Sequence, residues 1–286
     1  CVYETVREQV AGDLLGRGKR KPTNDELIAT GFLAIGPKPL NQGNKALFQL
    51  DVVDEQIDAT TRSFIGLTVS CARCHDHKFD PISTKDYYAM AGIFMSTRVL
   101  DTRSRIGANR LKVGMLSDGE KNRRNGVIRE RDELQKQFDA LTDKTSHEAR
   151  RMERRLDALK AMPLPEDGEA MSAQEGAYSN SRLNKVGDMP IYLRGDYRTP
   201  GKVVPRGVLS VIAGKHAKPI GERTKQSGRI ELAKWIADPE NPLTARVMAN
   251  RVWQQHLGQA IVRTPNNFGA LGQAPTFLKC ANRPLV

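Results

Sequence analysis

The stretch Phe64-Ile-Gly-Leu-Thr-Val-Ser-Cys-Ala-Arg-Cys-His-Asp-His-Lys-Phe-Asp-Pro-Ile-Ser83 gathers two of the four cysteines and two of the five histidines of the chain. An apolar run leads into it, and a helix-like, aromatic segment follows it. Cys71, Cys74 and His75 have the Cys-x-x-Cys-His spacing at which a c-type haem is attached. Two thiols two residues apart can reach two vinyl groups of one porphyrin, and the next residue then lies under the iron.

The first hypothesis for this motif is therefore a covalent haem c. Cys71 and Cys74 would form the thioether bonds, and His75 would be the axial ligand. The sequence does not choose the ligand on the opposite side of the iron, for which the candidates are Met90, Met95 and His77.

Three other interpretations stay open. The two cysteines could form a disulfide that holds a loop in a non-haem structural or carbohydrate-associated module. The cysteines and histidines could bind zinc, or His75, His77 and Asp80 could hold a harder divalent metal and act as a hydrolase. A histidine flanked by carboxylates can also serve as a general base. A thioredoxin-like redox pair is disfavoured, because no βαβ pattern surrounds the motif.

Apolar spacing predicts helices on both sides of the motif. Val2 to Leu15 is amphipathic, and residues 47–69 have the spacing of a long helix. Thr23 or Asn24 can cap a short helix between them. Downstream of Pro81, Ser83 or Thr84 can cap a helix that runs through Phe94.

Residues 119–161 form a strongly charged region with two apolar stripes whose phase breaks near His147. This pattern predicts two antiparallel helices joined by a turn. Residues 162–188 are rich in Pro, Gly, Ser and acidic residues, which predicts a linker between domains. The predicted organisation is a domain at 1–118, the hairpin at 119–161, the linker, and a C-terminal domain at 189–286.

The C-terminal part predicts a short strand from Met189, a helix over residues 229–237, and a further helix capped by Asn241 and ended by Gly258. Its polar and aromatic side chains have two interpretations. They could bind an anionic ligand, or Trp253 and Val247 could pack while the arginines form internal ion pairs. The residues concerned are Arg246, Asn250, Arg251, Trp253 and His256. The fold class expected overall is mainly α: an irregular, helical, two-domain architecture with a charged hairpin and a few short β segments.

Composition limits the possible partners. The formal charge is +12, but much of the basic excess lies in one helical stretch with interleaved acids, and aromatic residues are only 6%. A nucleic-acid partner is therefore not expected. No apolar run reaches the roughly 18 residues of a membrane span. Neither a glycine-rich phosphate loop nor a nucleophile elbow is present.

Several of these motifs resemble one family. The segment Phe64–Phe94 resembles the Planctomycete-type cytochrome c proteins, as do Glu8-Gln-Val-Ala-Gly-Asp-Leu-Leu15 and Ala29-Thr-Gly-Phe32 upstream of it. Asn241-Pro-Leu-Thr-Ala-Arg-Val-Met-Ala-Asn-Arg-Val-Trp-Gln-Gln-His256 and Val262-Arg-Thr-Pro-Asn-Asn-Phe-Gly269 resemble the core of the C-terminal domain of unknown function that accompanies them.

The resemblance implies an extracytoplasmic electron-transfer protein that handles electrons near polysaccharide breakdown. Its implied partners are a redox protein or an upstream cytochrome domain, together with acidic polysaccharide. The first residue is Cys1 rather than Met, so the chain is expected to be a fragment whose signal peptide lies outside it. After Thr276 the sequence, including Cys280, departs from the family pattern.

Overall fold

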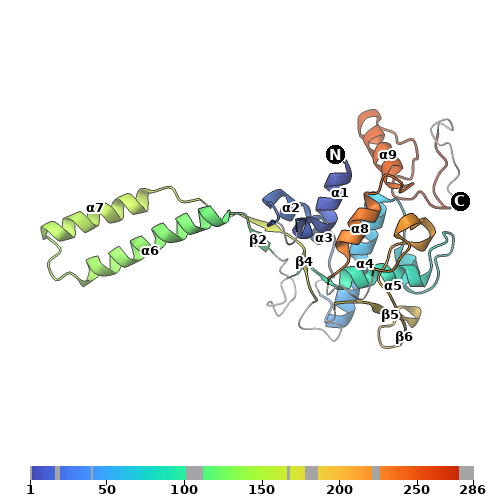
Figure 1. Ribbon diagram of the computed structural model, residues 1–286, viewed down its shortest axis with the longest axis horizontal. Helices are drawn as coiled ribbons and strands as arrows, with labels where there is room; N and C mark the ends of the chain where they lie inside the picture. Colours follow the sequence, from blue (N-terminus) through green and yellow to red (C-terminus); the bar gives the residue numbers. More distant parts are fainter. Residues whose placement is uncertain are drawn as a thin grey trace. The chain divides into compact units, whose positions relative to one another are not determined.

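The computed structural model describes residues 2–16, 20–39, 41–100, 112–165, 168–177, 186–220 and 226–276. Within these ranges the fold is mainly α with a few short strands, as the sequence predicted (Figure 1). The α-helices are α1 Val2–Ala11, α2 Asn24–Ala29, α3 Phe32–Ile35, α4 Lys45–Phe64, α5 Thr84–Met95, α6 Asp118–Ala140, α7 His147–Ala161, α8 Arg229–Ile236 and α9 Thr244–Leu257.

The strands are short, and each pairs with one other strand to form a two-stranded sheet. β1 (Thr97–Arg98) pairs with β4 (Gln174–Glu175), β2 (Lys112–Gly114) with β3 (Glu169–Met171), and β5 (Met189–Tyr192) with β6 (Pro200–Val204). Single 3₁₀ turns occur at η1 Gly12–Leu14, η2 Ser70–Arg73, η3 Leu193–Gly195, η4 Ser210–Ile212 and η5 Gly214–His216. The strand predicted from Met189 is thus confirmed.

The chain divides into two compact units, one made of residues 1–112 and 171–286 and the other of residues 113–170. Residues 1–112 of the predicted N-terminal domain and the whole predicted C-terminal domain therefore lie within a single unit. The reason is that their helices share one apolar core: α1 packs on α8, α4 packs on α5, and α9 packs on α4. The predicted linker, 162–188, lies partly outside the described residues.

The second unit contains the predicted helical hairpin. α6 and α7 are antiparallel neighbours joined by a turn at residues 141–146 (Figure 1). Leu156 and Leu159 of α7 are buried, and Arg155 bonds Glu130 across the pair at 2.7 Å. α6 has no buried residue, so the hairpin is a largely solvated element, as its charge pattern indicated.

Local capping accounts for most helix starts. Thr23 and Ser83 each accept a hydrogen bond from the third residue of their helix and form capping boxes with Glu26 and Asp86. Gly258, with φ 78°, ends α9 as predicted. Each of these features uses residues only three or four positions apart.

Three helix boundaries differ from the prediction. The helix expected over Val2 to Leu15 ends at Ala11 and is followed by the 3₁₀ turn η1. The helix expected to reach Val69 ends at Phe64, because Gly66 adopts φ 61°, which an α-helix cannot continue. Asn241 does not cap α9, which begins at Thr244. Instead, the Asn241 side chain accepts a hydrogen bond from the Leu243 amide and donates one to the Trp235 carbonyl, so it stabilises the turn before the helix.

A buried ion pair joins the two sequence halves of the first unit. Arg229, at the start of α8, is 0% exposed and donates two hydrogen bonds to Asp13, at 2.7 and 2.8 Å. It also donates to the Val10 carbonyl at the end of α1. Because both charges are removed from water, loss of either partner leaves the other charge uncompensated.

Among the described residues, no helix has both the length and the apolar character that crossing a bilayer requires.

Asp13→Asn tests this ion pair. The substitution keeps the side-chain size but leaves Arg229 buried without its counter-charge, so we expect a loss of about 3–5 kcal/mol of unfolding free energy. Chemical denaturation followed by circular dichroism measures it. The matched control is Asp196→Asn, which removes the half-buried partner of the exposed Arg198 at the surface and should leave the unfolding midpoint unchanged. Equal effects of the two substitutions would contradict the prediction.

Candidate functional site

The Cys-x-x-Cys-His motif lies in the irregular segment between α4 and α5. Its first part is the 3₁₀ turn η2 (Ser70–Arg73). Cys71, Cys74 and His75 are all exposed, and both cysteines are free thiols in the structure. Ala72, between the cysteines, is fully buried, so the turn is seated on the core by its apolar residue and presents its thiols outward.

One hydrogen bond orients the ring of His75. Nδ1 lies 2.7 Å from the carbonyl oxygen of Asp76. Because a carbonyl oxygen only accepts, Nδ1 is the donor, and in the neutral ring Nε2 therefore keeps its lone pair. A metal-ligating histidine commonly has this arrangement, in which the second ring nitrogen donates to a carbonyl.

The carboxylate of Asp76 is bonded to the first turn of α5 rather than to the ring of His75. It accepts a hydrogen bond from the Thr84 amide at 2.7 Å. This backbone hydrogen bond lowers the pKa of Asp76 from its ordinary value. The carboxylate therefore stays ionised at the first turn of α5, where it complements the helix dipole.

Arg73, between the two cysteines, connects the motif to α4 and α5. Its guanidinium donates to Asp51 at 3.0 Å and lies 3.9 Å from Asp54. Its backbone carbonyl accepts from the Tyr88 hydroxyl at 3.1 Å, and the Tyr87 hydroxyl donates to Asp54 at 2.8 Å. Charged and hydroxyl groups of α4 and α5 thus hold the motif on its core side.

Burial dominates the titration of these groups. It raises the pKa of Asp54, against the opposing effects of the Tyr87 hydroxyl and the Arg73 charge. Burial, followed by the negative charge of Asp54, raises the pKa of Tyr87 well above its usual value. Tyr87 therefore remains a hydrogen-bond donor at pH values at which an ordinary tyrosine would lose its proton.

The ring of His77 has a structural role in the turn that precedes Pro81. Its side chain is 7% exposed, and its Nδ1 accepts a hydrogen bond from the Asp80 amide at 2.9 Å. Nδ1 must therefore be unprotonated, so its 3.5 Å approach to the Asp80 carboxylate is not an ion pair. Nε2 lies 3.5 Å from the Thr68 hydroxyl. The ring closes the turn before Pro81 rather than facing solvent.

Asp80 binds the C-terminal part of the chain. Its carboxylate accepts a hydrogen bond from the Ala270 amide at 2.6 Å, across 190 residues of sequence. A Cβ atom at Gly269 would lie 2.4 Å from both carboxylate oxygens, so only glycine allows this approach. Nearby, the Phe268 amide donates to the Gly66 carbonyl at 2.7 Å.

Arg251 and Asn250 of α9 stabilise the same contact. Arg251 donates to the Arg62 carbonyl at 2.9 Å and to the Asn266 side chain at 2.8 Å. Asn250 exchanges two hydrogen bonds with the backbone of Val262. These polar side chains thus hold the 262–270 loop against the motif segment. Trp253, predicted as a packing residue in one interpretation, is instead 41% exposed.

The turn of the β5–β6 hairpin also reaches the motif. A Cβ atom at Gly195 would lie 2.7 Å from the Cys74 sulfur, and Gly195 has φ 75°. Arg194, just before it, has φ 55°, the one positive φ of a non-glycine residue in the described ranges. The sequence contains no signal that links this turn to Cys74, and sequence reasoning missed it.

Among the described residues, the predicted metal ligands His75, His77 and Asp80 do not form a metal site. Within the described residues, no group of three or more His, Cys, Asp or Glu side chains is placed to hold a metal ion. Nδ1 of His77 and one carboxylate oxygen of Asp80 accept hydrogen bonds from backbone amides, while His75 faces solvent. Met90 is 0% exposed and Met95 is 2% exposed. Both lie in the core, so neither shares the surface position of the motif.

The residues of the motif itself fit a covalent haem in three respects. Both thiols are unbonded and exposed, which attachment requires. The ring of His75 has the tautomer that leaves Nε2 available as a ligand. The turn is supported from the core side by Arg73 and Ala72, and its two cysteines lie at the surface, where Cys74 borders Gly195 of the β5–β6 turn. Haem would add a redox-active iron at this surface.

Comparison with known proteins matches two segments of the chain. Residues 3–99 match the family model PSCyt2, described as a protein of unknown function (DUF1549), and residues 228–279 match PSD1, described as a protein of unknown function (DUF1553). Both are domains of unknown function associated with the Planctomycete cytochrome c family, in agreement with the resemblance of the motifs. No curated protein and no solved structure matches the chain.

The contact between these two matched segments makes a testable prediction. Gly269→Ala places a methyl group against the Asp80 carboxylate, so the 262–270 loop should detach from the motif segment. We expect faster proteolysis of the C-terminal segment and a lower unfolding midpoint. Gly119→Ala is the control, because a Cβ there meets nothing within 4 Å and alanine favours the helix. A Gly269→Ala protein as resistant to protease as the wild type would contradict the contact.

Proposed function

We propose that the Cys71–His75 turn is the attachment site of a c-type haem and that the protein transfers electrons through it. The observation that carries this proposal is the state of the motif: two free, exposed thiols on one turn, next to an imidazole whose Nδ1 is bound to a carbonyl. In this proposal Cys71 and Cys74 form the thioether bonds, and Nε2 of His75 is the axial ligand.

The surrounding residues position the motif. Arg73 holds the turn to α4 through Asp51 and Asp54, and it holds the turn to α5 through the hydroxyl of Tyr88. The hydrogen bond to Asp76 keeps the imidazole of His75 in one tautomer. A rigid site of this kind favours electron transfer, because little of the protein has to rearrange when the charge of the site changes.

His75 is the single axial ligand that we propose from the described part of the chain. Met90 and Met95 are core residues, and the Nδ1 atom of His77 accepts a backbone amide. The exposed position of the motif would allow short electron-transfer distances to a docked redox partner.

The resemblance supports an extracytoplasmic location, in which covalent haem attachment and free exchange with a redox protein or an upstream cytochrome domain are feasible. We extend the proposal to that location and to a setting of polysaccharide breakdown, where the excess of basic residues suits an acidic polysaccharide. These assignments go beyond the domain matches, whose descriptions state no function.

The proposal is tested by producing the chain in a periplasm that contains a haem-attachment system. We expect a Soret band that remains with the polypeptide after denaturation and acid extraction, with one haem per chain. Cys71→Ala and Cys74→Ala should abolish the covalent band, whereas His75→Ala should keep bound porphyrin but change its spectrum. Cys280→Ala is the matched control, since that cysteine lies outside the motif, and it should leave the band unchanged.

Two outcomes would overturn the proposal in favour of the alternatives. Colourless protein that lacks free thiols at Cys71 and Cys74 would favour a disulfide-containing structural or carbohydrate-associated module. Colourless protein with a stoichiometric divalent metal that is lost in His75→Ala would favour metal-dependent chemistry. Mass spectrometry of alkylated peptides and elemental analysis distinguish these two cases.

Met90→Leu separates a core role from a ligand role in the haem-loaded protein. Leucine conserves the volume of the buried side chain but has no sulfur, so we expect an unchanged absorption spectrum and a loss of less than about 1.5 kcal/mol of stability. Spectra of the oxidised and reduced protein, with denaturant unfolding, measure both quantities. A change in the spectrum on this substitution would identify Met90 as a ligand.

A further inference from the structure

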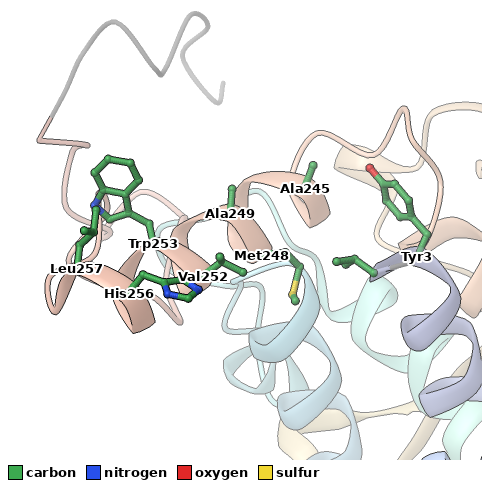
Figure 2. Close-up of a pocket in the computed structure, with 9 residues that line it drawn as sticks. Tyr3, Ala245, Met248, Ala249, Val252, Trp253, His256 and Leu257 are labelled. Atoms are coloured by element: carbon green, nitrogen blue, oxygen red, sulfur yellow. The ribbon is translucent and has the colours of Figure 1, made fainter.

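An open apolar groove lies between α9 and the beginning of α1, away from the residues of the proposed redox site. Its volume is about 650 Å³, and its lining is almost wholly apolar. Figure 2 shows Trp253 and Leu257 at one end, Tyr3 at the other, and the small side chains of Ala245 and Ala249 between them. Neither the domain matches nor the proposed electron transfer assigns any role to this groove.

The groove follows one complete face of α9. Ala245, Met248, Ala249, Val252 and Trp253 recur at steps of three and four residues, which places them in one stripe. Such a stripe normally packs against another helix, but here Val252 is 51% exposed and Trp253 is 41% exposed. From Ala245 to Leu257 the lining extends over a little more than three turns, which at 1.5 Å per residue is about 18 Å.

The opposite face of α9 is the one that the fold buries. Thr244 and Val247 are 0% exposed, and Asn250 is 3% exposed and bonded to Val262. The fold of the first unit therefore uses one side of α9 completely and leaves a second apolar side uncovered. Two small alanines at the centre, flanked by large side chains, allow the backbone of an added helix to approach closely.

Charge favours a foreign helix over a second copy of this chain. The α9 sequence contains Arg246, Arg251 and His256 and no carboxylate. Arg251 is bonded to Asn266, whereas Arg246 makes no ion pair within the described ranges. Arg251 faces the fold, where it is bonded to Arg62 and Asn266, so Arg246 is the α9 guanidinium that remains for a partner. Two copies of α9 would bring their Arg246 side chains together in a chain that already carries +12. Acidic residues beside the apolar stripe of a partner would instead pair with Arg246.

The shape also distinguishes a helix from a membrane surface. A bilayer is met by apolar side chains that protrude from a convex face. Here the lining residues, drawn in Figure 2, come from two helices and form a concavity, a shape that can accept a ridge of side chains. We propose that this groove is a docking site for an amphipathic helix of a partner protein, with Leu- or Ile-type side chains in its stripe and Asp or Glu on its flanks.

Tryptophan fluorescence of the full chain tests the proposal, because Trp253 is exposed and Trp235, the other tryptophan, is 1% exposed. The probe is a 14-residue helical peptide with leucines at helical spacing and glutamates on both flanks. We expect a blue shift of the emission and a Kd on the order of 10 μM. A peptide with the same leucines but lysine flanks should bind at least tenfold more weakly.

Ala249→Glu introduces bulk and a carboxylate at the centre of the groove and should reduce binding of the acidic peptide at least tenfold. The control is Val203→Glu, at an apolar position on β6 that is 57% exposed and lies outside the groove lining. Circular dichroism verifies that both variants fold.

Three results would overturn the proposal: equal affinity for the acidic and basic peptides, a concentration-dependent dimer that Ala249→Glu dissociates, and preferential binding to vesicles of anionic phospholipid. Absence of any emission change with the acidic peptide would do so as well. The assay uses no haem, so its outcome is independent of the proposed redox function.

Discussion

The segment between α4 and α5 has almost no regular structure of its own, and its conformation depends on hydrogen bonds from the rest of the chain. α5 contributes the Tyr88 hydroxyl, α4 contributes the carboxylate of Asp51, and the C-terminal loop contributes the Ala270 amide. An irregular segment keeps one shape only if its polar groups find fixed partners. The surface geometry of Cys71 and Cys74 therefore depends on residues distributed over the whole first unit.

Local rules predicted the helices well. Thr23 and Ser83 could be recognised as caps because a cap requires only a side-chain oxygen and an amide three residues later. The charged hairpin followed from the phase break between two apolar stripes. The end of α4 was placed too late, because apolar spacing continues past Gly66 although the backbone does not. Asn241 was assigned to the wrong structure, because a turn and a cap require the same residue type.

The site was predicted only in part. Its motif residues were visible from their spacing, but His77 and Asp80 looked like ligands because sequence shows their chemistry and not their partners. Asp80 meets Ala270 across 190 residues, and the sulfur of Cys74 meets the turn at Gly195. Contacts at such separations come from packing, for which a single sequence contains no local signal. The sequence left open whether Trp253 packs or faces a ligand, for the same reason, and the structure shows it 41% exposed.

The pairing of β1 with β4 has a consequence for how this chain can vary. Thr97 lies opposite Glu175, so the two ends of the intervening segment leave the first unit side by side. The entropy cost of closing a loop rises by only about 0.6 kcal/mol for each doubling of its length. The α6–α7 excursion can therefore lengthen, shorten or be exchanged for another module at little thermodynamic cost. This makes it the natural place for a reporter or an affinity handle that leaves the rest of the protein intact.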